Sequence, residues 1–238
     1  MEKLKNKVAY ITGGSQGIGL GVARALLDQG MRIAISGRSQ EKLDQAVETL
    51  GASEDVLLAW PSDVRNMADE ENMIQKIEEK WGRLDVLVAN AGVGAYGSIV
   101  DLTTDQWNQA IDTNLTGVFH SVKASVSAIR KSKGYIITIA SLAGTNFFAG
   151  GSAYNASKFG LVGFTQAVML DLRQDDVKVS TIMPGSVATH FNNNTPDESD
   201  NWKIQPEDVG KLVTDLLTMH PRTLPSKVEV RPSKPPKK

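Results

Sequence analysis

KVAYITGGSQGIGLGVARALLDQ, residues 7–29, joins a strand-like run to a helical pattern through a glycine-rich turn. The largely apolar run at residues 7–12 favours a strand, and residues 18–29 have the periodicity of an amphipathic helix. The glycines between them, at residues 13–19, follow the spacing G-x-x-x-G-x-G. Free N–H groups at the start of a helix bind phosphate, and glycine lets a pyrophosphate approach them closely. This stretch therefore predicts the first strand, turn and helix of a dinucleotide-binding fold.

Strand and helix patterns alternate along the rest of the chain. Short, mostly apolar runs indicate strands at residues 7–12, 31–36, 55–60, 84–89, 134–140, 177–183 and 227–231. Helical patterns lie between them at residues 18–29, 41–50, 67–81, 105–130 and 206–219. Such a series predicts an α/β fold, a Rossmann-type doubly wound parallel sheet of about seven strands with helices on both faces.

The length of 238 residues fits one domain, and no interdomain linker is visible. We expect residues 1–231 to form a single NAD(P)-binding domain with a substrate loop at about residues 186–205. Residues 232–238, PSKPPKK, have no apolar face to bury, so the sequence predicts a disordered tail.

Composition argues against several classes of function. Lysine plus arginine number 26 and aspartate plus glutamate 27, so no global field favours nucleic acid or an anionic membrane as a partner. The chain has no cysteine and three well-separated histidines, which argues against disulfides, thiolate catalysis and a metal site. No signal peptide pattern is present, and no apolar run reaches the roughly 18 residues that span a bilayer. We therefore expect a soluble, cytoplasmic protein.

A second motif, Y-x-x-x-K, places Tyr154 and Lys158 on one face of a helix. A phenol titrates near pH 10 and a neighbouring cation favours its ionised form, so Lys158 is predicted to draw the pKa of Tyr154 toward neutrality. Alone, this spacing is common among surface helices. It gains meaning from Ser141, at the end of a predicted strand, and from Asn114, in the preceding helix.

With these motifs in this order, the chain resembles the short-chain dehydrogenase/reductase family over residues 7 to about 190. The resemblance implies that Tyr154 is the catalytic acid/base and that Ser141 hydrogen-bonds the carbonyl oxygen. It also implies that Lys158 binds the nicotinamide ribose and that Asn114 holds a water connecting Lys158 to solvent. The implied reaction is hydride transfer with a nicotinamide cofactor, which interconverts a carbonyl and a secondary alcohol.

The resemblance further implies a cofactor site. Its residues come from the glycine loop, the turns after the strands and the catalytic helix: Gly13, Ser15, Gln16, Gly17, Ile18, Gly19, Arg38, Ser39, Asp63, Val64, Asn90, Ala91, Gly92, Tyr154, Lys158, Pro184, Gly185, Val187 and Thr189. The family segment N-N-A-G begins here with Ala89, which departs from the pattern beside Asn90.

The segment after the second strand predicts a preference for NADP(H), with NAD(H) also possible. An NAD enzyme carries an acidic residue about 20 residues beyond the glycine loop, where it binds the ribose 2′-hydroxyl. Here Gly37, Arg38 and Ser39 offer space, a guanidinium fork and a hydroxyl to a 2′-phosphate. Gln16 adds no cation, and the alternative for Arg38 is to stack on adenine or to face solvent.

Aromatic side chains predict a largely apolar substrate pocket, with packing in a lid or a subunit contact as the alternative. The candidates are Tyr96, Phe147, Phe148, Phe191 and Trp202. The substrate loop carries three acidic residues, Asp197, Glu198 and Asp200, against a lone Lys203. The sequence therefore offers little support for a strongly anionic substrate.

Other functions stay open at this point. Much of the chain resembles 3-oxoacyl-(acyl carrier protein) reductases, and Arg130, Lys131 and Lys133 offer positive charge to an acidic carrier, although cations at a helix C-terminus also favour its dipole. The C-terminal LPSKVEVRPSK looks more like the branch with sepiapterin reductase and hydroxy-acid or serine dehydrogenases. A catalytically silent NADP(H)-binding sensor would be expected to lose members of the tetrad, yet all four are present. The family also implies a homotetramer or homodimer, formed through the long helices that start near residues 105 and 151.

Overall fold

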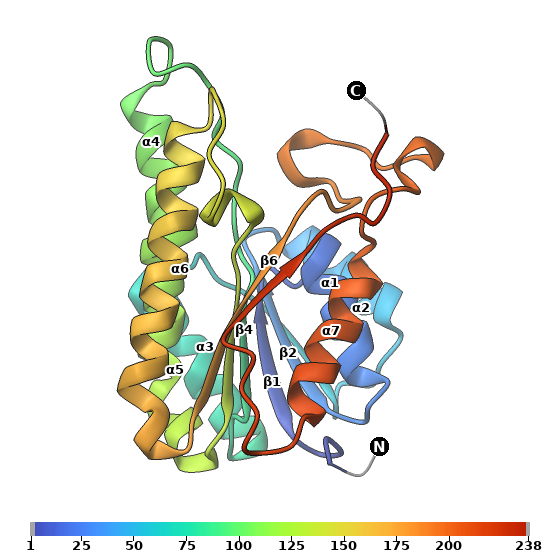
Figure 1. The fold of residues 1–238 in the computed structure, drawn as a ribbon. Helices are drawn as coiled ribbons and strands as arrows, with labels where there is room; N and C mark the ends of the chain where they lie inside the picture. Colours follow the sequence, from blue (N-terminus) through green and yellow to red (C-terminus); the bar gives the residue numbers. More distant parts are fainter. Residues whose placement is uncertain (1–2, 237–238) are drawn as a thin grey trace.

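Seven parallel strands form the central sheet of the computed structural model, which describes residues 3–236 (Figure 1). The strands are β1 Val8–Thr12, β2 Arg32–Gly37, β3 Leu57–Pro61, β4 Val86–Ala89, β5 Tyr135–Ile139, β6 Lys178–Pro184 and β7 Lys227–Val230. Their order in the sheet is β3-β2-β1-β4-β5-β6-β7, and every neighbouring pair is parallel. The predicted Rossmann-type fold is confirmed.

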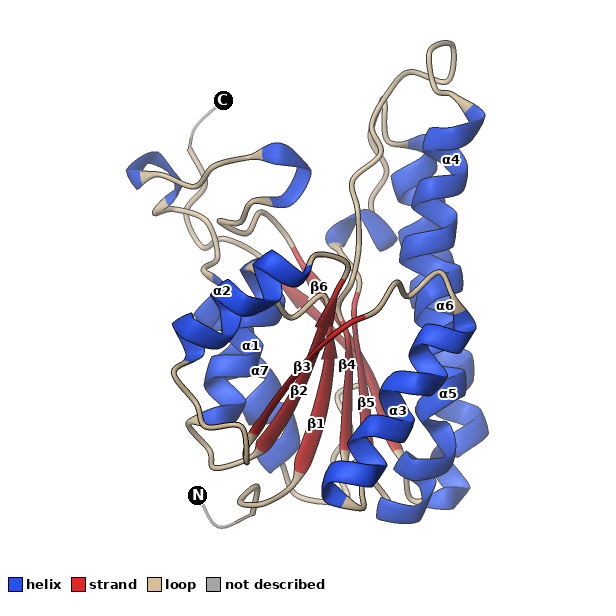
Figure 2. Ribbon diagram, turned by 180° about the vertical axis from the view of Figure 1, so that it is seen from behind, coloured by secondary structure: helices blue, strands red, loops and turns tan. Residues whose placement is uncertain are grey.

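Helices cover both faces of this sheet. They are α1 Gly17–Leu27, α2 Gln40–Leu50, α3 Met67–Trp81, α4 Thr104–Ile111, α5 Gly117–Ser132, α6 Ser152–Leu172 and α7 Pro206–Thr218. α1, α2 and α7 lie on one face, and α3, α5 and α6 on the other, with α4 continuing the line of α5 (Figures 1 and 2). No described helix is long and apolar enough to cross a membrane.

The two faces of β1 show why its sequence is apolar at every position. Ala9 and Ile11 belong to the core beneath α1, α2 and α7, whereas Val8 and Tyr10 belong to the core beneath α3, α5 and α6. All four side chains are fully buried. Strands covered by helices on both faces have no solvent side on which polar residues could alternate.

The helix predicted over residues 105–130 is interrupted in its middle. Between α4 and α5 the chain forms a π-helical segment, Asp112–Thr116, in which the hydrogen bonds span one residue more than in an α-helix. Asn114 lies in this segment and is completely buried. Such single-turn bulges are frequently found at functional sites, and hydrophobic periodicity alone does not reveal them.

The order of the strands reverses at β1, and a crevice forms at this point of the sheet. β1 pairs with β2 on one side and with β4 on the other, so the chain crosses from one half of the sheet to the other between β3 and β4. In open α/β sheets, ligands bind outside the carboxyl ends of the strands at such a switch point.

Candidate active site

A cleft of about 990 Å³ opens at the carboxyl ends of the central strands. Its wall contains every predicted cofactor residue except Gly19, and it also contains Ser141. A side chain at Gly19 would clash with the Gly13 carbonyl, so this glycine permits close packing beneath the loop and does not line the cleft. Among residues 3–236 no cluster of side chains has the composition of a metal site.

The glycine loop leaves the start of α1 open toward the cleft. Gln16, at the N-cap, makes no side-chain hydrogen bond to the first turn, and Gly17 and Ile18 line the wall. Gly13 and Gly17 have φ of +63° and +53°, a region that suits glycine. A Cβ on Gly13 would lie only 3.0 Å from Ala91 Cα. Free N–H groups at a positive helix end in a tightly filled loop fit the pyrophosphate of a dinucleotide.

Thr12 and Asn90 hold this loop to the turn after β4. The Thr12 hydroxyl accepts hydrogen bonds from the backbone N–H groups of Asn90 and Ala91, both at 3.0 Å. In return, the Asn90 side-chain amide donates to the carbonyls of Thr12 and Gly13, each at 3.0 Å. The predicted ribose residue Asn90 thus lies in the wall but directs its amide toward the loop. Sequence reasoning assigned no role to Thr12.

Three of the four predicted catalytic side chains converge in one part of the wall. Ser141 follows β5, while Tyr154 and Lys158 come from the first two turns of α6 and are almost fully buried. The Lys158 ammonium donates to the carbonyl of Ile139 at 3.1 Å and lies 5.8 Å from the centre of the Tyr154 ring. The i, i+4 spacing on α6 therefore brings both groups to the cleft, as the sequence predicts.

The protein groups alone raise the pKa of Tyr154. Burial raises it most, the neighbouring Tyr96 raises it further, and the Ser141 hydroxyl opposes this by stabilising the phenolate. Lys158 does not lower it, because the ammonium bonds to Ile139 and stays several ångströms from the ring. Burial lowers the pKa of Lys158 itself to about 8, since an ammonium loses hydration in the interior.

Asn114 lies behind the wall. Its Oδ1 accepts from the N–H of Val93 at 2.8 Å, and its Nδ2 donates to the Val93 carbonyl at 2.9 Å and to Ser157 Oγ at 3.0 Å. A Cβ on Gly92 would lie 3.2 Å from Asn114 Oδ1 and 3.6 Å from Lys158 Nζ. The missing side chain at Gly92 therefore leaves room between the asparagine and the lysine.

Aromatic rings also lie around Tyr154. The ring of Tyr96 lies 5.2 Å from that of Tyr154, and the Phe191 ring lies 6.0 Å from it. Phe148 packs at 6.1 Å from Tyr96, and Trp202 also lines the cleft. Phe147 was a wrong prediction, because its side chain is 87% exposed and outside the wall. Of this pair, only Phe148 lines the cleft.

Two cations line the cleft beyond β2. Arg38 is one, as predicted, and Lys42, in the first turn of α2, is the other, which the sequence did not single out. Ser39 Oγ accepts from the N–H of Lys42 at 3.3 Å and caps that helix. Asp63 lines the same end and pairs with Arg65 at 2.5 Å, and the guanidinium holds the pKa of the carboxyl below its usual value.

The tail also reaches the cleft. The sequence predicts disorder from residue 232 onward, whereas Pro232 and Pro235 lie in the wall; residues 237–238 lie outside the described residues. The Val230 carbonyl accepts from the N–H of Gly185 at 2.8 Å, so the edge strand delivers the tail beside the turn after β6. The tail has no apolar face of its own. It is held in place because β7 pairs at the edge of the sheet and because the start of the tail lies against Gly185.

Comparisons with known proteins agree over most of the chain. The sequence profile of short chain dehydrogenases matches residues 7–200. An uncharacterised oxidoreductase of Staphylococcus aureus strain MW2 is 31% identical over 233 residues, which are 98% of this chain and 100% of the relative. A solved metagenomic short-chain oxidoreductase in complex with NADP is 33% identical, with a TM-score of 0.85 and coverage of 98% of this chain and 100% of that one.

An alcohol dehydrogenase from the archaeon Thermococcus sibiricus, complexed with 5-hydroxy-NADP, is 26% identical with a TM-score of 0.90, and the alignment again covers 98% of this chain and 100% of that one. The profile spans most of the sequence, and the shared fold spans nearly all of it. The chain therefore belongs to the short chain dehydrogenase family of oxidoreductases, which use nicotinamide cofactors.

Proposed function

We propose that this protein is an NADP(H)-dependent oxidoreductase that interconverts a carbonyl and a secondary alcohol, with Tyr154 as the acid/base. The observation that carries the proposal is the meeting of Ser141, Tyr154 and Lys158 in the wall of a cleft that also contains an open glycine loop. Ser141 and Tyr154 both line this wall, so their hydroxyls can act on one carbonyl oxygen.

Tyr154 and Ser141 have separate roles when the carbonyl is reduced. When bound, the reduced nicotinamide supplies the hydride that adds to the carbonyl carbon. Tyr154 donates its phenolic proton to the carbonyl oxygen, which completes the alcohol and leaves a phenolate. Its raised pKa keeps the phenol protonated at neutral pH, the state that reduction requires. Ser141 donates a hydrogen bond to the same oxygen and stabilises the charge that develops there.

Lys158 and Asn114 help to return a proton to the Tyr154 phenolate. Lys158 Nζ lies 5.8 Å from the centre of the Tyr154 ring, and its pKa of about 8 suits proton exchange near neutrality. The space beside Gly92, between Lys158 Nζ and Asn114 Oδ1, supports the route to solvent that the family resemblance implies.

The preference for NADP(H) rests on the charges after β2. Arg38 and Lys42 line the cleft there, and no acidic residue occupies positions 37–39 to repel a 2′-phosphate. Four similar solved structures contain NADP, NADPH or a derivative, and one contains NADH, so use of NAD(H) at lower efficiency is compatible with the family.

The alternative function, reduction of 3-oxoacyl groups on an acyl carrier protein, requires a positively charged surface, and the structure offers little support for one. Arg130 pairs with Asp175 at 2.8 Å and Lys133 with Asp176 at 2.7 Å, while Lys131 lies 3.9 Å from Glu78. These pairings largely neutralise the cluster proposed to meet an acidic carrier. Retention of the complete tetrad favours turnover over a silent sensor.

Self-association is also proposed, through the outer surface of α4, α5 and α6. Phe119 and Phe159 are 45% and 42% exposed there, and Leu170 is exposed as well. Large apolar side chains of this kind on neighbouring helices are typical of a protein interface.

The experiment that tests the function replaces one hydroxyl at a time. Tyr154→Phe should lower kcat at least about 100-fold while leaving NADPH affinity, measured by fluorescence titration, unchanged. Tyr96→Phe is the comparison variant, because its ring lies 5.2 Å away in the same wall. It removes a hydroxyl that raises the pKa of Tyr154, so it should shift the pH profile but lower kcat far less than Tyr154→Phe. Loss of turnover in Tyr96→Phe but not in Tyr154→Phe would overturn the assignment.

A further inference from the structure

A buried carboxyl group has no part in the chemistry proposed above. Glu70, in the first turn of α3, is completely buried, and its Oε2 has no hydrogen-bond partner among the described residues. No ion pair within residues 3–236 includes this carboxyl, and burial raises its pKa. A carboxyl group buried without a cation costs stability, and perturbed groups of this kind cluster at functional sites.

Two hydroxyl groups bond to Glu70. The hydroxyls of Ser62 and Tyr10 both donate to its Oε1, at 2.7 and 2.9 Å. Tyr10 in turn shares a hydrogen bond of 2.9 Å with Ser36 Oγ. These four residues, which we call the Glu70 cluster, are at most 5% exposed. The cluster joins α3 to β1, to β2 and to the turn after β3, and a buried network of this kind holds its elements in one arrangement.

The Glu70 cluster extends to the wall of the cleft. Two of its members, Ser36 and Ser62, line that wall. Ser36 immediately precedes Gly37 and Arg38, and Ser62 immediately precedes Asp63. β3, β2 and β1 lie side by side in the sheet (Figure 2). The cluster therefore holds together the two chain segments that form the end of the cleft beyond β2.

Backbone bonds complete the attachment of the turn after β3. The N–H of Ser62 donates to the carbonyl of Gly37 at 3.1 Å, which ties the turn to the end of β2. The N–H of Asp63 donates to Asp69 Oδ2 at 3.0 Å. Asp69 and Glu70 are adjacent in the first turn of α3, so this helix holds both Ser62 and Asp63.

We propose that Glu70 is a positioning residue for the adenosine half of the cofactor, and that it acts through Ser62 and Tyr10. It holds the ends of β2 and β3 at a spacing at which the segments that carry Arg38 and Asp63 face the same adenosine. An apolar side chain would fill this space without the cost of desolvating a carboxyl group, so core packing alone does not require Glu70. The proposal rests on the cofactor site of the proposed function and not on the reaction.

The test measures binding of the adenosine half alone. Adenosine 2′,5′-bisphosphate contains the adenosine and the 2′-phosphate of NADP without the nicotinamide, and its binding is followed by calorimetry. Glu70→Leu should raise its Kd about 10-fold, which corresponds to about 1.4 kcal/mol, because Ser62 and Tyr10 lose their common acceptor. Glu70→Gln should restore most of the binding, since an amide oxygen accepts from both hydroxyls. With saturating NADPH, kcat should stay unchanged in both variants while KM for NADPH follows the Kd.

Tyr10→Phe and Tyr135→Phe form a matched pair of variants. Each removes a buried tyrosine hydroxyl that bonds to a serine on the neighbouring strand, Ser36 at 2.9 Å and Ser180 at 2.7 Å. Ser36 lines the cleft and Ser180 does not. Tyr10→Phe should therefore weaken binding of adenosine 2′,5′-bisphosphate, whereas Tyr135→Phe should leave it unchanged. Phenylalanine keeps the ring in the core, so this pair tests the proposal even if Glu70→Leu does not fold.

Several results would overturn the positioning role. One is an equal Kd in wild type, Glu70→Leu and Tyr10→Phe, and another is equal weakening in Tyr10→Phe and Tyr135→Phe, because lost core packing would then explain both. A lower kcat with unchanged KM for NADPH would also overturn it, as would a wild type that binds no adenosine 2′,5′-bisphosphate.

Binding is measured without turnover, so this role is tested separately from the reaction. The expected changes in Kd, in a protein that reduces no ketone, would refute the reaction and support the role of Glu70. Ketone reduction with unchanged binding in every variant would refute the role of Glu70 and leave the reaction standing.

Discussion

Cofactor selection provides a quantitative prediction, because NADPH and NADH differ only by the 2′-phosphate. Arg38 and Lys42 line the end of the cleft beyond β2, where Asp63 is already neutralised by Arg65. A charge-assisted hydrogen bond contributes about 1.5–3 kcal/mol, which corresponds to roughly 10-fold to 150-fold in affinity. We expect Arg38→Gln to lower kcat/KM for NADPH at least about 10-fold, and Lys42→Gln to have a smaller effect, because a lysine lacks the bidentate fork.

The variant Gly37→Asp/Arg38→Gln should reverse the preference. A Cβ on Gly37 would lie 3.2 Å from Ser15 Oγ, a side chain that can rotate away, so the new carboxylate fits without displacing the backbone. There it repels a 2′-phosphate and accepts from a 2′-hydroxyl, as in NAD enzymes. Lys42 stays in place, so we expect residual activity with NADPH.

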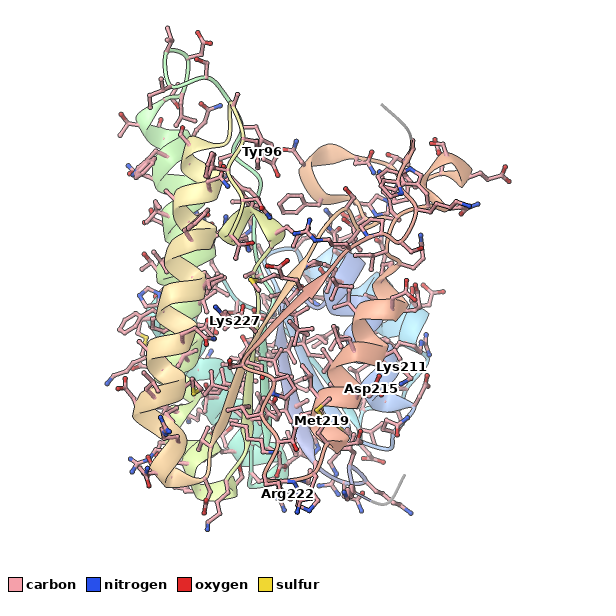
Figure 3. The ribbon with its side chains drawn as sticks, in the orientation of Figure 1. Tyr96, Lys211, Asp215, Met219, Arg222 and Lys227 are labelled. Carbon is pink, nitrogen blue, oxygen red and sulfur yellow. The ribbon has the colours of Figure 1, made fainter. Side chains whose placement is uncertain are left out.

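The assay measures kcat/KM with both cofactors at one fixed carbonyl concentration. Lys211→Gln is the control, since Lys211 lies on the outer face of α7 paired with Asp215 (Figure 3). Equal or higher efficiency with NADH in the unmodified enzyme would refute the reasoning. Equal losses with both cofactors in Arg38→Gln would assign the arginine to adenine stacking instead.

Three further predictions follow from the site. Phe148→Ala should raise substrate KM about fivefold, as expected for roughly 1 kcal/mol of lost apolar contact, whereas Phe147→Ala, at the 87% exposed neighbour, should leave kinetics unchanged. Deleting residues 232–238 removes Pro232 and Pro235 from the wall and should raise substrate KM about threefold with little change in Tm; unchanged kinetics would show that the tail does not act at the cleft. Burial lowers the pKa of Lys158 to about 8, so the folded state disfavours its charge, and stability should rise as pH increases from about 8 toward the unfolded value near 10.4. In urea unfolding curves at pH 7, 8, 9 and 10, the stability of Lys158→Met should not show this increase. At pH 7 the free energy of unfolding of Lys158→Met should exceed that of wild type by roughly 3 kcal/mol, and this difference should shrink as the pH rises. Parallel pH profiles for the two proteins would refute the buried charge.

Much of the fold and the site could be predicted from local sequence. Residues 7–12 are apolar on both faces and the glycines at residues 13–19 open a helix, so the first βα unit is encoded within one short stretch. The four-residue spacing of Tyr154 and Lys158 fixes their common face wherever the helix lies. Local spacing also separated strands from helices, and the observed bounds differ from the expected ones by only a few residues.

The tertiary structure decided what depends on neighbours distant in sequence. The π-helical turn that buries Asn114, the bonds from Asn90 to the glycine loop and the choice of Phe148 over Phe147 all follow from packing between separate elements. The rise in the pKa of Tyr154 came from burial, which outweighs a cation that bonds elsewhere. Arg231 reaches the cleft only because β7 pairs at the sheet edge. Spacing along the chain determines local geometry, so the pattern of strands and helices could be predicted from the sequence. Desolvation and charge depend on which atoms the fold brings together, so the electrostatics of the cleft could not be predicted in this way.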